Sequence, residues 1–143
     1  MFLKGDKYSD VRGSLTYNNA FDASVIKRIY TIENATTDFV RGWQGHQIEQ
    51  RWFAAMMGSF EITVIQVDDF TSPSEDLVGE KCVLTSEELS YLHVTSGCIT
   101  AIQALEENSK LLVLADYGVG EINDEVRFSI DYFKNIVFNT TKK

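Results

Sequence analysis

The sequence predicts an all-β barrel or sandwich with one helix at its C-terminal end. Three observations predict this fold. Apolar and polar residues alternate with a period of two in the middle of the chain, turn residues recur roughly every 8 to 12 positions, and the spacing becomes helical from residue 123 onward. The chain has 143 residues and one proline, with no proline-rich linker and no internal repeat. We therefore expect residues 1–143 to form a single domain.

The first half of the chain predicts four strands. Residues 25–33 are rich in β-branched side chains, and residues 37–43 follow as a second strand. Residues 50–57 are aromatic and apolar, whereas residues 59–67 alternate between apolar and polar side chains. Because Gly58 provides a turn between the last two segments, they are predicted to pair as a central hairpin.

The second half contains a loop, a turn and another pair of strands. Residues 71–80 are polar and predict a loop, and residues 85–89 predict a short helical turn with a Thr or Ser N-cap. Residues 98–105 and 109–116 are apolar and flank a polar turn. We predict that they form a second hairpin.

The tail is interpreted as an amphipathic helix. Its apolar stripe consists of Val126, Ile130, Phe133 and Val137. Asn123 is a plausible N-cap, and the acidic run 121–125 is then the solvated start of the helix. The alternative is a strand-rich extension.

Charge and composition limit the partners. The formal net charge of −8 argues against double-stranded nucleic acid, which needs clustered Lys and Arg. A small phosphorylated ligand needs only two or three local cations. The polar N-terminus and the absence of a long apolar run predict a cytoplasmic protein without a membrane segment. Cys82 and Cys98 lack metal-site spacing and are expected to be free thiols.

Four short segments resemble, in this order, the sugar-nucleotide cupins. They are residues 10–15 (DVRGSL), 26–30 (IKRIY), 41–46 (RGWQGH, with a later Gly58-Ser59) and 111–115 (LLVLA). The similarity is to the 3,4-ketoisomerases that act on dTDP-4-keto-6-deoxyglucose and, more distantly, to the dTDP-4-keto sugar 3,5-epimerases. It covers about residues 8 to 135. It implies a cupin barrel, also described as a double-stranded β-helix or jelly roll.

The positions that hold a metal in other cupins are mostly changed in this chain. They are occupied by Gln44, His46, Gln50 and Thr100. Only His46 is a good ligand for zinc, iron or manganese, so we expect no tightly bound metal and no other cofactor. Gln44 and Thr100 also replace two histidines of the ketoisomerases. Either the chain acts on a related substrate with fewer polar groups, or it binds without turnover.

The resemblance implies an isomerase that moves a keto group between C4 and C3 of a dTDP-linked 6-deoxyhexose. Such a reaction removes a proton next to a carbonyl and passes through an enediol. His46 is the candidate base, since histidine titrates near neutral pH, and Tyr30 is the candidate donor of a proton or hydrogen bond. The substrate contacts that the resemblance implies are Arg12, Arg28, Arg41 and Gln44.

Two other functions stay open, as does the role of several aromatic residues. The chain could be a non-catalytic sugar-nucleotide-binding cupin or a 3,5-epimerase-like enzyme.

His93 is expected to be structural. Trp43, Trp52, Phe53 and Phe60 are expected in the core or a subunit interface, with one of them able to stack on a nucleotide base. The family resemblance also implies a homodimer that exchanges or pairs its N-terminal strands.

Overall fold

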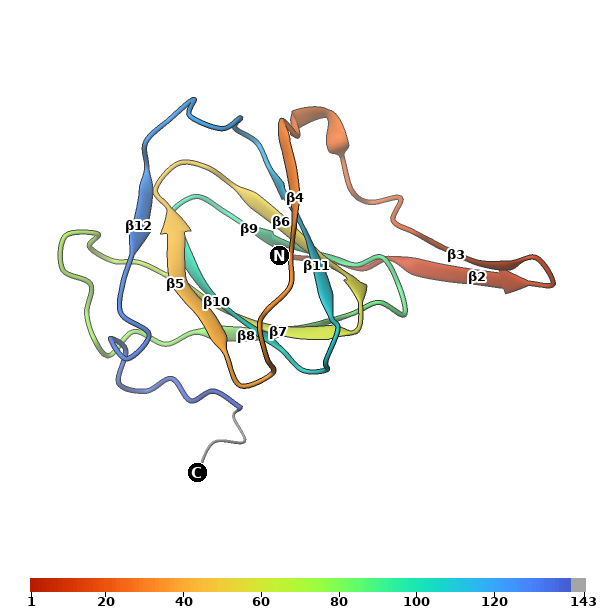
Figure 1. Cartoon of the computed structure of the whole chain (residues 1–143). Coiled ribbons are helices and arrows are strands. Elements are labelled where there is room, and N and C mark those ends of the chain that lie inside the picture. Colours follow the sequence, from red (N-terminus) through yellow and green to blue (C-terminus); the bar gives the residue numbers. More distant parts are fainter. Residues whose placement is uncertain (140–143) are drawn as a thin grey trace.

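The computed structural model describes residues 1–139 as two five-stranded antiparallel sheets and a two-stranded arm (Figure 1). The strands are β1 (Phe2–Leu3), β2 (Asp6–Asp10), β3 (Gly13–Tyr17), β4 (Arg28–Ile32), β5 (Val40–His46), β6 (Arg51–Met57), β7 (Ser59–Gln66), β8 (Glu80–Thr85), β9 (Tyr91–Val94), β10 (Cys98–Ala104), β11 (Lys110–Ala115) and β12 (Glu125–Arg127). One 3₁₀ turn, Ala23–Val25, precedes β4. The all-β prediction is confirmed.

The two sheets pack face to face around one apolar core. The first sheet has the strand order β1-β9-β6-β11-β4, and the second has the order β12-β5-β10-β7-β8. Inward side chains of both sheets meet in the core, among them Phe53 of β6, Phe60 and Ile62 of β7, Ile102 of β10 and Val113 of β11. Each sheet is a separate hydrogen-bonded unit, so the fold is cupin-like without being one closed barrel.

The predicted strands are present, but neither predicted hairpin is. Segment 50–57 becomes β6, which pairs with β9 and β11, whereas segment 59–67 becomes β7, which pairs with β8 and β10. Gly58 lies between them with a φ of +70°, and a Cβ there would lie 2.1 Å from Ser109 Oγ. The chain therefore uses this turn to pass from one sheet to the other.

The second predicted hairpin is wrong in the same way. Strand β10 pairs with β5 and β7, and β11 pairs with β4 and β6. A turn signal shows where the chain reverses but does not show which strand is the partner. Both faces of these strands are largely buried, as is typical of strands at the centre of a sheet that is covered on both sides.

The predicted C-terminal helix is not formed within the described residues. Residues Glu125–Arg127 form β12 beside β5, and the chain continues irregularly over the outer face of the second sheet (Figure 1). Phe128 exchanges two backbone hydrogen bonds with Trp43, of 3.1 and 3.2 Å, and the ring of Phe133 meets that of Trp43 edge-on at 5.2 Å. The sheet surface covers the apolar stripe without a helix, and Val137 at its end is 76% exposed.

Strands β2 and β3 were not predicted, and they form an arm that projects from the body (Figure 1). Nearly all of its residues are exposed, including Tyr8, Val11 and Leu15. Strands β8 and β9 were not predicted either. Residues 86–88 form a turn between them, where the sequence predicted a short helical turn. The prediction of a loop before β8 is confirmed. Among residues 1–139, no helix is long and apolar enough to cross a membrane.

Candidate active site

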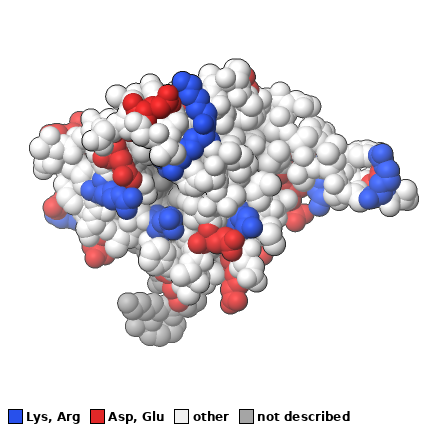
Figure 2. All heavy atoms as spheres, turned by 45° about the horizontal axis from the view of Figure 1, so that its top comes forward, with Lys and Arg blue, Asp and Glu red and all other residues white. Residues whose placement is uncertain are grey.

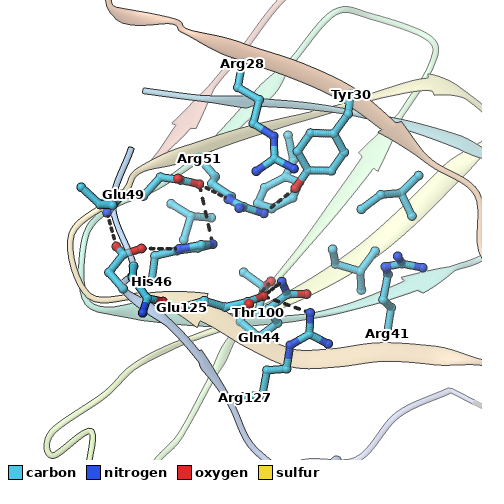
Figure 3. A pocket seen from close by; sticks show the side chains of 18 of the residues that line it. Arg28, Tyr30, Arg41, Gln44, His46, Glu49, Arg51, Thr100, Glu125 and Arg127 are labelled. Atoms are coloured by element: carbon cyan, nitrogen blue, oxygen red, sulfur yellow. Dashed lines mark hydrogen bonds and ion pairs between the residues drawn. The ribbon is translucent and has the colours of Figure 1, made fainter. Parts of the chain in front are cut away.

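A cavity of about 400 Å³ opens between the sheets at one end of the molecule. Its walls come from β4, β5, β6 and β10 and from the segment that leads into β12 (Figure 3). The cavity is lined mainly by charged and polar side chains. Five of the six residues assigned to the site from the sequence line it, and they are Arg28, Tyr30, Arg41, Gln44 and His46.

Strand β5 brings Gln44 and His46 into the cavity through its two-residue period. Residues that are two apart share one face of a strand, so these side chains face the cavity while Trp43 packs on the opposite face. Gly45 lies between them, where a Cβ would come within 2.1 Å of the backbone oxygen of Cys98. A glycine is therefore required for β5 to approach β10 at this point.

His46 and Asp124 form a buried pair at the inner end of the cavity. The Nδ1 of His46 lies 2.9 Å from Asp124 Oδ1, and both residues are 8% exposed. A carboxylate only accepts hydrogen bonds, so in the neutral form of the ring Nδ1 carries the proton and Nε2 has the lone pair. Within the described residues, Nε2 has no hydrogen-bond partner. This is the tautomer that a general base requires.

Asp124 is held in place by backbone as well as by His46. Its Oδ2 accepts hydrogen bonds from the N–H groups of Ile48 and Glu49, both of 2.8 Å. Burial raises the pKa of Asp124, but the hydrogen bonds from the Glu49 N–H, the His46 ring and the Ile48 N–H lower it more, so its pKa lies below the ordinary value. The interpretation of 121–125 as a solvated helix start is thus wrong at Asp124.

A second buried group connects His46 to Tyr30. Glu49 Oε2 lies 3.6 Å from His46 Nε2 and accepts a 2.7 Å hydrogen bond from Arg51 Nε. The Nη1 of Arg51 donates to the Tyr30 hydroxyl. Figure 3 shows these side chains in a row across one wall of the cavity. The candidate base and the candidate acid are therefore linked through one ion pair.

Arg28 and Arg41 are the cations available to a ligand. Within the part of the chain that the structure describes, neither forms an ion pair with an acidic residue. The guanidinium of Arg28 lies over the Tyr30 ring, 4.6 Å from its centroid. Burial raises the pKa of the Tyr30 phenol, against the opposing effect of the Arg51 and Arg28 charges, so Tyr30 is protonated at neutral pH.

The part of the cavity wall around Gln44 and Thr100 is polar, but neither of these two positions holds a histidine. Gln44 donates from Nε2 to Glu125, which also accepts a 3.0 Å hydrogen bond from Arg127. Thr100 lies on β10 directly across from Gln44. An amide and a hydroxyl of this kind can orient a sugar hydroxyl but cannot take up or release a proton at neutral pH.

Arg12 does not line the cavity. It lies in the turn of the projecting arm, where it forms a 2.7 Å ion pair with Asp10, and Figure 2 shows basic atoms at the far end of this arm. His93 lies outside the cavity lining as well. Its ring stacks on Trp52 at 4.5 Å, and its Nε2 lies 2.7 Å from Gln50 Oε1. Neither residue therefore lines the candidate site of its own chain.

The four aromatic residues divide between core and cavity. Trp43, Trp52 and Phe60 are buried in apolar clusters. Phe53 is buried as well and lines the cavity. It is thus the member of the set that contacts the candidate site.

His46, Glu49 and Asp124 bring three possible metal-ligand atoms within 4.8 Å of one another. A divalent cation fits poorly there, because Asp124 Oδ1 already accepts from His46 and Glu49 Oε2 already accepts from the positively charged Arg51. The absence of a tightly bound metal stays a prediction from the donor types.

Sequence reasoning missed Asp124, Glu49 and Arg51. Asp124 is separated from His46 by 78 positions, and nothing in its acidic surroundings sets it apart. Glu49 and Arg51 follow the motif 41–46 with a spacing of two, Glu49 just before β6 and Arg51 at its first position. That spacing was the one signal by which the pair could have been found.

The chain matches one family model and resembles several solved structures. The family model described as "FdtA: WxcM-like, C-terminal" matches residues 2–136. A 3,4-ketoisomerase structure from Helicobacter canadensis is 25% identical, with a TM-score of 0.69 over 93% of this chain and 93% of that one. The 3,4-ketoisomerase QdtA from Thermoanaerobacterium thermosaccharolyticum, solved as a mutant with TDP-4-keto-6-deoxyglucose, is 23% identical, with a TM-score of 0.69 over 93% of this chain and 90% of that one.

A more distant structure extends the likeness in fold. The dTDP-4-dehydrorhamnose 3,5-epimerase from Bacillus anthracis, solved with TDP and PPi bound, has a TM-score of 0.77 over 99% of this chain and 85% of that one, at 12% identity. No curated protein sequence matches the chain. Because the family model covers nearly the whole chain, this protein belongs to the WxcM-like, C-terminal family.

Proposed function

We propose that this chain is a 3,4-ketoisomerase acting on a dTDP-linked 4-keto-6-deoxyhexose. The observation that supports it most is His46, which Asp124 holds in the lining of a cavity that also contains Arg28 and Arg41, and whose Nε2 has no hydrogen-bond partner among residues 1–139. A base, a phenol and two nearby cations are the groups that proton transfer next to a carbonyl on a nucleotide sugar requires. Family membership and the ketoisomerase structures point to the same reaction.

In the first step, His46 Nε2 removes the proton from C3 of the sugar. The electron pair of the C3–H bond forms a C3=C4 double bond, and the carbonyl pair moves onto O4. Tyr30 donates its proton to O4, and the nearby guanidinium groups stabilise the charge that develops there and on the phenolate. Asp124 stabilises the His46 imidazolium. The product of this step is an enediol.

In the second step, the proton on His46 is delivered to C4. The Tyr30 phenolate takes the proton from O3, the O3 electron pair forms the C3 carbonyl, and the electron pair of the double bond forms the new C4–H bond. Both side chains return to their starting protonation states. The net change is the transfer of one hydrogen from C3 to C4 and one from O3 to O4.

Turnover in deuterated water tests this function and separates it from epimerisation. We expect dTDP-4-keto-6-deoxyglucose to be converted to a 3-keto sugar with deuterium at C4, followed by NMR. Exchange at C3 and C5 with the keto group still at C4 would indicate a 3,5-epimerase. The absence of deuterium at C3, C4 and C5 would count against both enzymes.

The diphosphate is expected to bind to Arg28 and Arg41, the two cavity arginines that form no ion pair with an acidic residue within positions 1–139. Arg41→Gln is predicted to weaken dTDP binding about tenfold in calorimetry, because a charge-assisted hydrogen bond to phosphate is replaced by a neutral one. Lys134→Gln is the control, since Lys134 pairs with Glu75 at the surface and does not line the cavity. Equal dTDP affinities of the wild type and Arg41→Gln would show that Arg41 does not contact the diphosphate.

Binding without turnover is the second candidate function. It is favoured by Gln44 and Thr100, which line the cavity and cannot transfer protons. In that case calorimetry would show tight dTDP binding, while the deuterium experiment would show no exchange. The two measurements together therefore distinguish a binding protein from an enzyme.

We further propose that the chain is a homodimer held together by its projecting arm. The arm exposes Tyr8, Val11 and Leu15, apolar side chains that a second chain would cover. Since Arg12 does not line the cavity of its own chain, any contact that it makes with a diphosphate would be in the cavity of the partner. Light scattering at micromolar concentration is expected to give the mass of a dimer, and a strictly monomeric species would refute the proposal.

A further inference from the structure

We propose that Glu49 is a positioning residue that balances charge between the base and the acid of this site. One of its carboxylate oxygens lies between the His46 imidazole and the Arg51 guanidinium, which allows both groups to be positively charged in one buried cavity. The role in turnover rests on the proposed function, whereas the charge arrangement is testable without a substrate.

The geometry fixes Glu49 from two sides. Its Oε2 lies 3.6 Å from His46 Nε2 and accepts from Arg51 Nε at 2.7 Å, so the same oxygen faces both the imidazole and the guanidinium. Its backbone N–H donates to Asp124, the residue that also holds the other side of the His46 ring. Glu49 is 6% exposed and the Arg51 side chain 13%. Water therefore screens these charges little.

Arg51 donates a hydrogen bond to Tyr30, and its positive charge must be balanced by a nearby negative charge. Its Nη1 donates to the Tyr30 hydroxyl and would stabilise a phenolate there. When His46 accepts a proton, an uncompensated guanidinium so close would oppose the imidazolium, because like charges in a poorly solvated site disfavour each other's charged forms. Glu49 removes this conflict. Its carboxylate lets Arg51 serve Tyr30 without weakening His46 as a base.

The other charged or titratable groups around the His46 ring are few. Asp124 and Glu125 come from the segment that enters β12, Tyr30 and Arg28 lie across the cavity on β4, and Cys98 is the backbone partner of His46 on β10. Of these, Asp124 contacts the ring directly and stays unchanged in the variants described below.

The test is an NMR titration of the imidazole protons in wild type and charge variants. The chain has two histidines, so two titration curves are expected, and His46→Asn assigns them by the loss of one. In Glu49→Gln the His46 midpoint should fall by about one pH unit, because Arg51 then acts alone. In Arg51→Gln it should rise. In the double variant it should lie between those of the single variants, while His93 serves as the internal reference.

A purely structural role for Glu49 would not produce opposite shifts in the two single variants. If the His46 midpoint is unchanged in Glu49→Gln although the spectrum shows a native fold, the proposal is overturned. If Glu49→Gln does not fold, Glu49→Asp and Arg51→Gln decide. Glu49→Asp keeps the negative charge and should leave the His46 midpoint unchanged. If the His46 midpoint does not rise in Arg51→Gln, the proposal is overturned.

Kinetics add a second readout once turnover is established. In Glu49→Gln we expect the acid limb of the kcat/KM profile to move to lower pH with the NMR midpoint, and kcat to fall by about tenfold or more with little change in KM. If the wild type does not turn over the keto sugar, the proposed function fails, but the titration still decides whether Glu49 balances the two charges.

Discussion

His46→Asn is expected to lower kcat by about a thousandfold or more and to leave the fold intact. The variant removes the proposed base for the C3 proton, and general-base catalysis typically contributes a factor of about 10² to 10⁴. The asparagine amide is close in size to the near half of the imidazole and can donate to Asp124 Oδ1 in place of Nδ1. The buried carboxylate therefore keeps a partner.

Rates of keto-sugar conversion by NMR and dTDP affinity by calorimetry check this prediction together. We expect unchanged dTDP affinity, since the proposed diphosphate contacts are at Arg28 and Arg41. His93→Gln is the matched control, because His93 lies outside the cavity and should leave kcat within about twofold of the wild type. A kcat for His46→Asn within tenfold of the wild type would show that another residue is the base.

Asp124→Asn is expected to lower kcat by about two to three orders of magnitude through the tautomer of His46. Asp124 Oδ2 accepts from two backbone N–H groups, so the single oxygen of asparagine must occupy that position. The amide NH₂ then faces His46 Nδ1 and makes that nitrogen an acceptor. The ring proton moves to Nε2, and the base loses the lone pair that it needs.

The same variant has a predicted signature in acid stability. The pKa of Asp124 is lowered in the folded state, so its contribution to the free energy of unfolding is present above the unfolded value near 3.8. It is lost as the pH falls through the lower folded value. Urea unfolding of wild type and Asp124→Asn should therefore differ at neutral pH and converge in strong acid. A difference in unfolding free energy that does not change with pH would contradict this assignment.

About half of the site could be predicted from the sequence. Tyr30, Gln44 and His46 were found because they lie in short motifs that resemble those of the sugar-nucleotide cupins, and each motif lies on a single strand. Arg12 was predicted to contact the substrate but does not line the cavity of its own chain. Nothing in its motif indicates that residues 6–17 form an arm that projects from the body. The tail was predicted as a helix from the helical spacing of its apolar residues. That prediction is wrong, because the same spacing also occurs in an irregular chain that packs across a sheet.

The sequence by itself determined the strands that became β4 to β7, β10 and β11, because periodicity and turn chemistry are local properties of the chain. Only the tertiary structure decided which strands pair and which groups surround His46. Asp124 reaches His46 because β12 pairs with β5, and Glu49 and Arg51 reach Tyr30 because β6 and β4 flank β11 in one sheet. Contacts between residues distant in sequence depend on how the two sheets pack, and no local pattern records that packing.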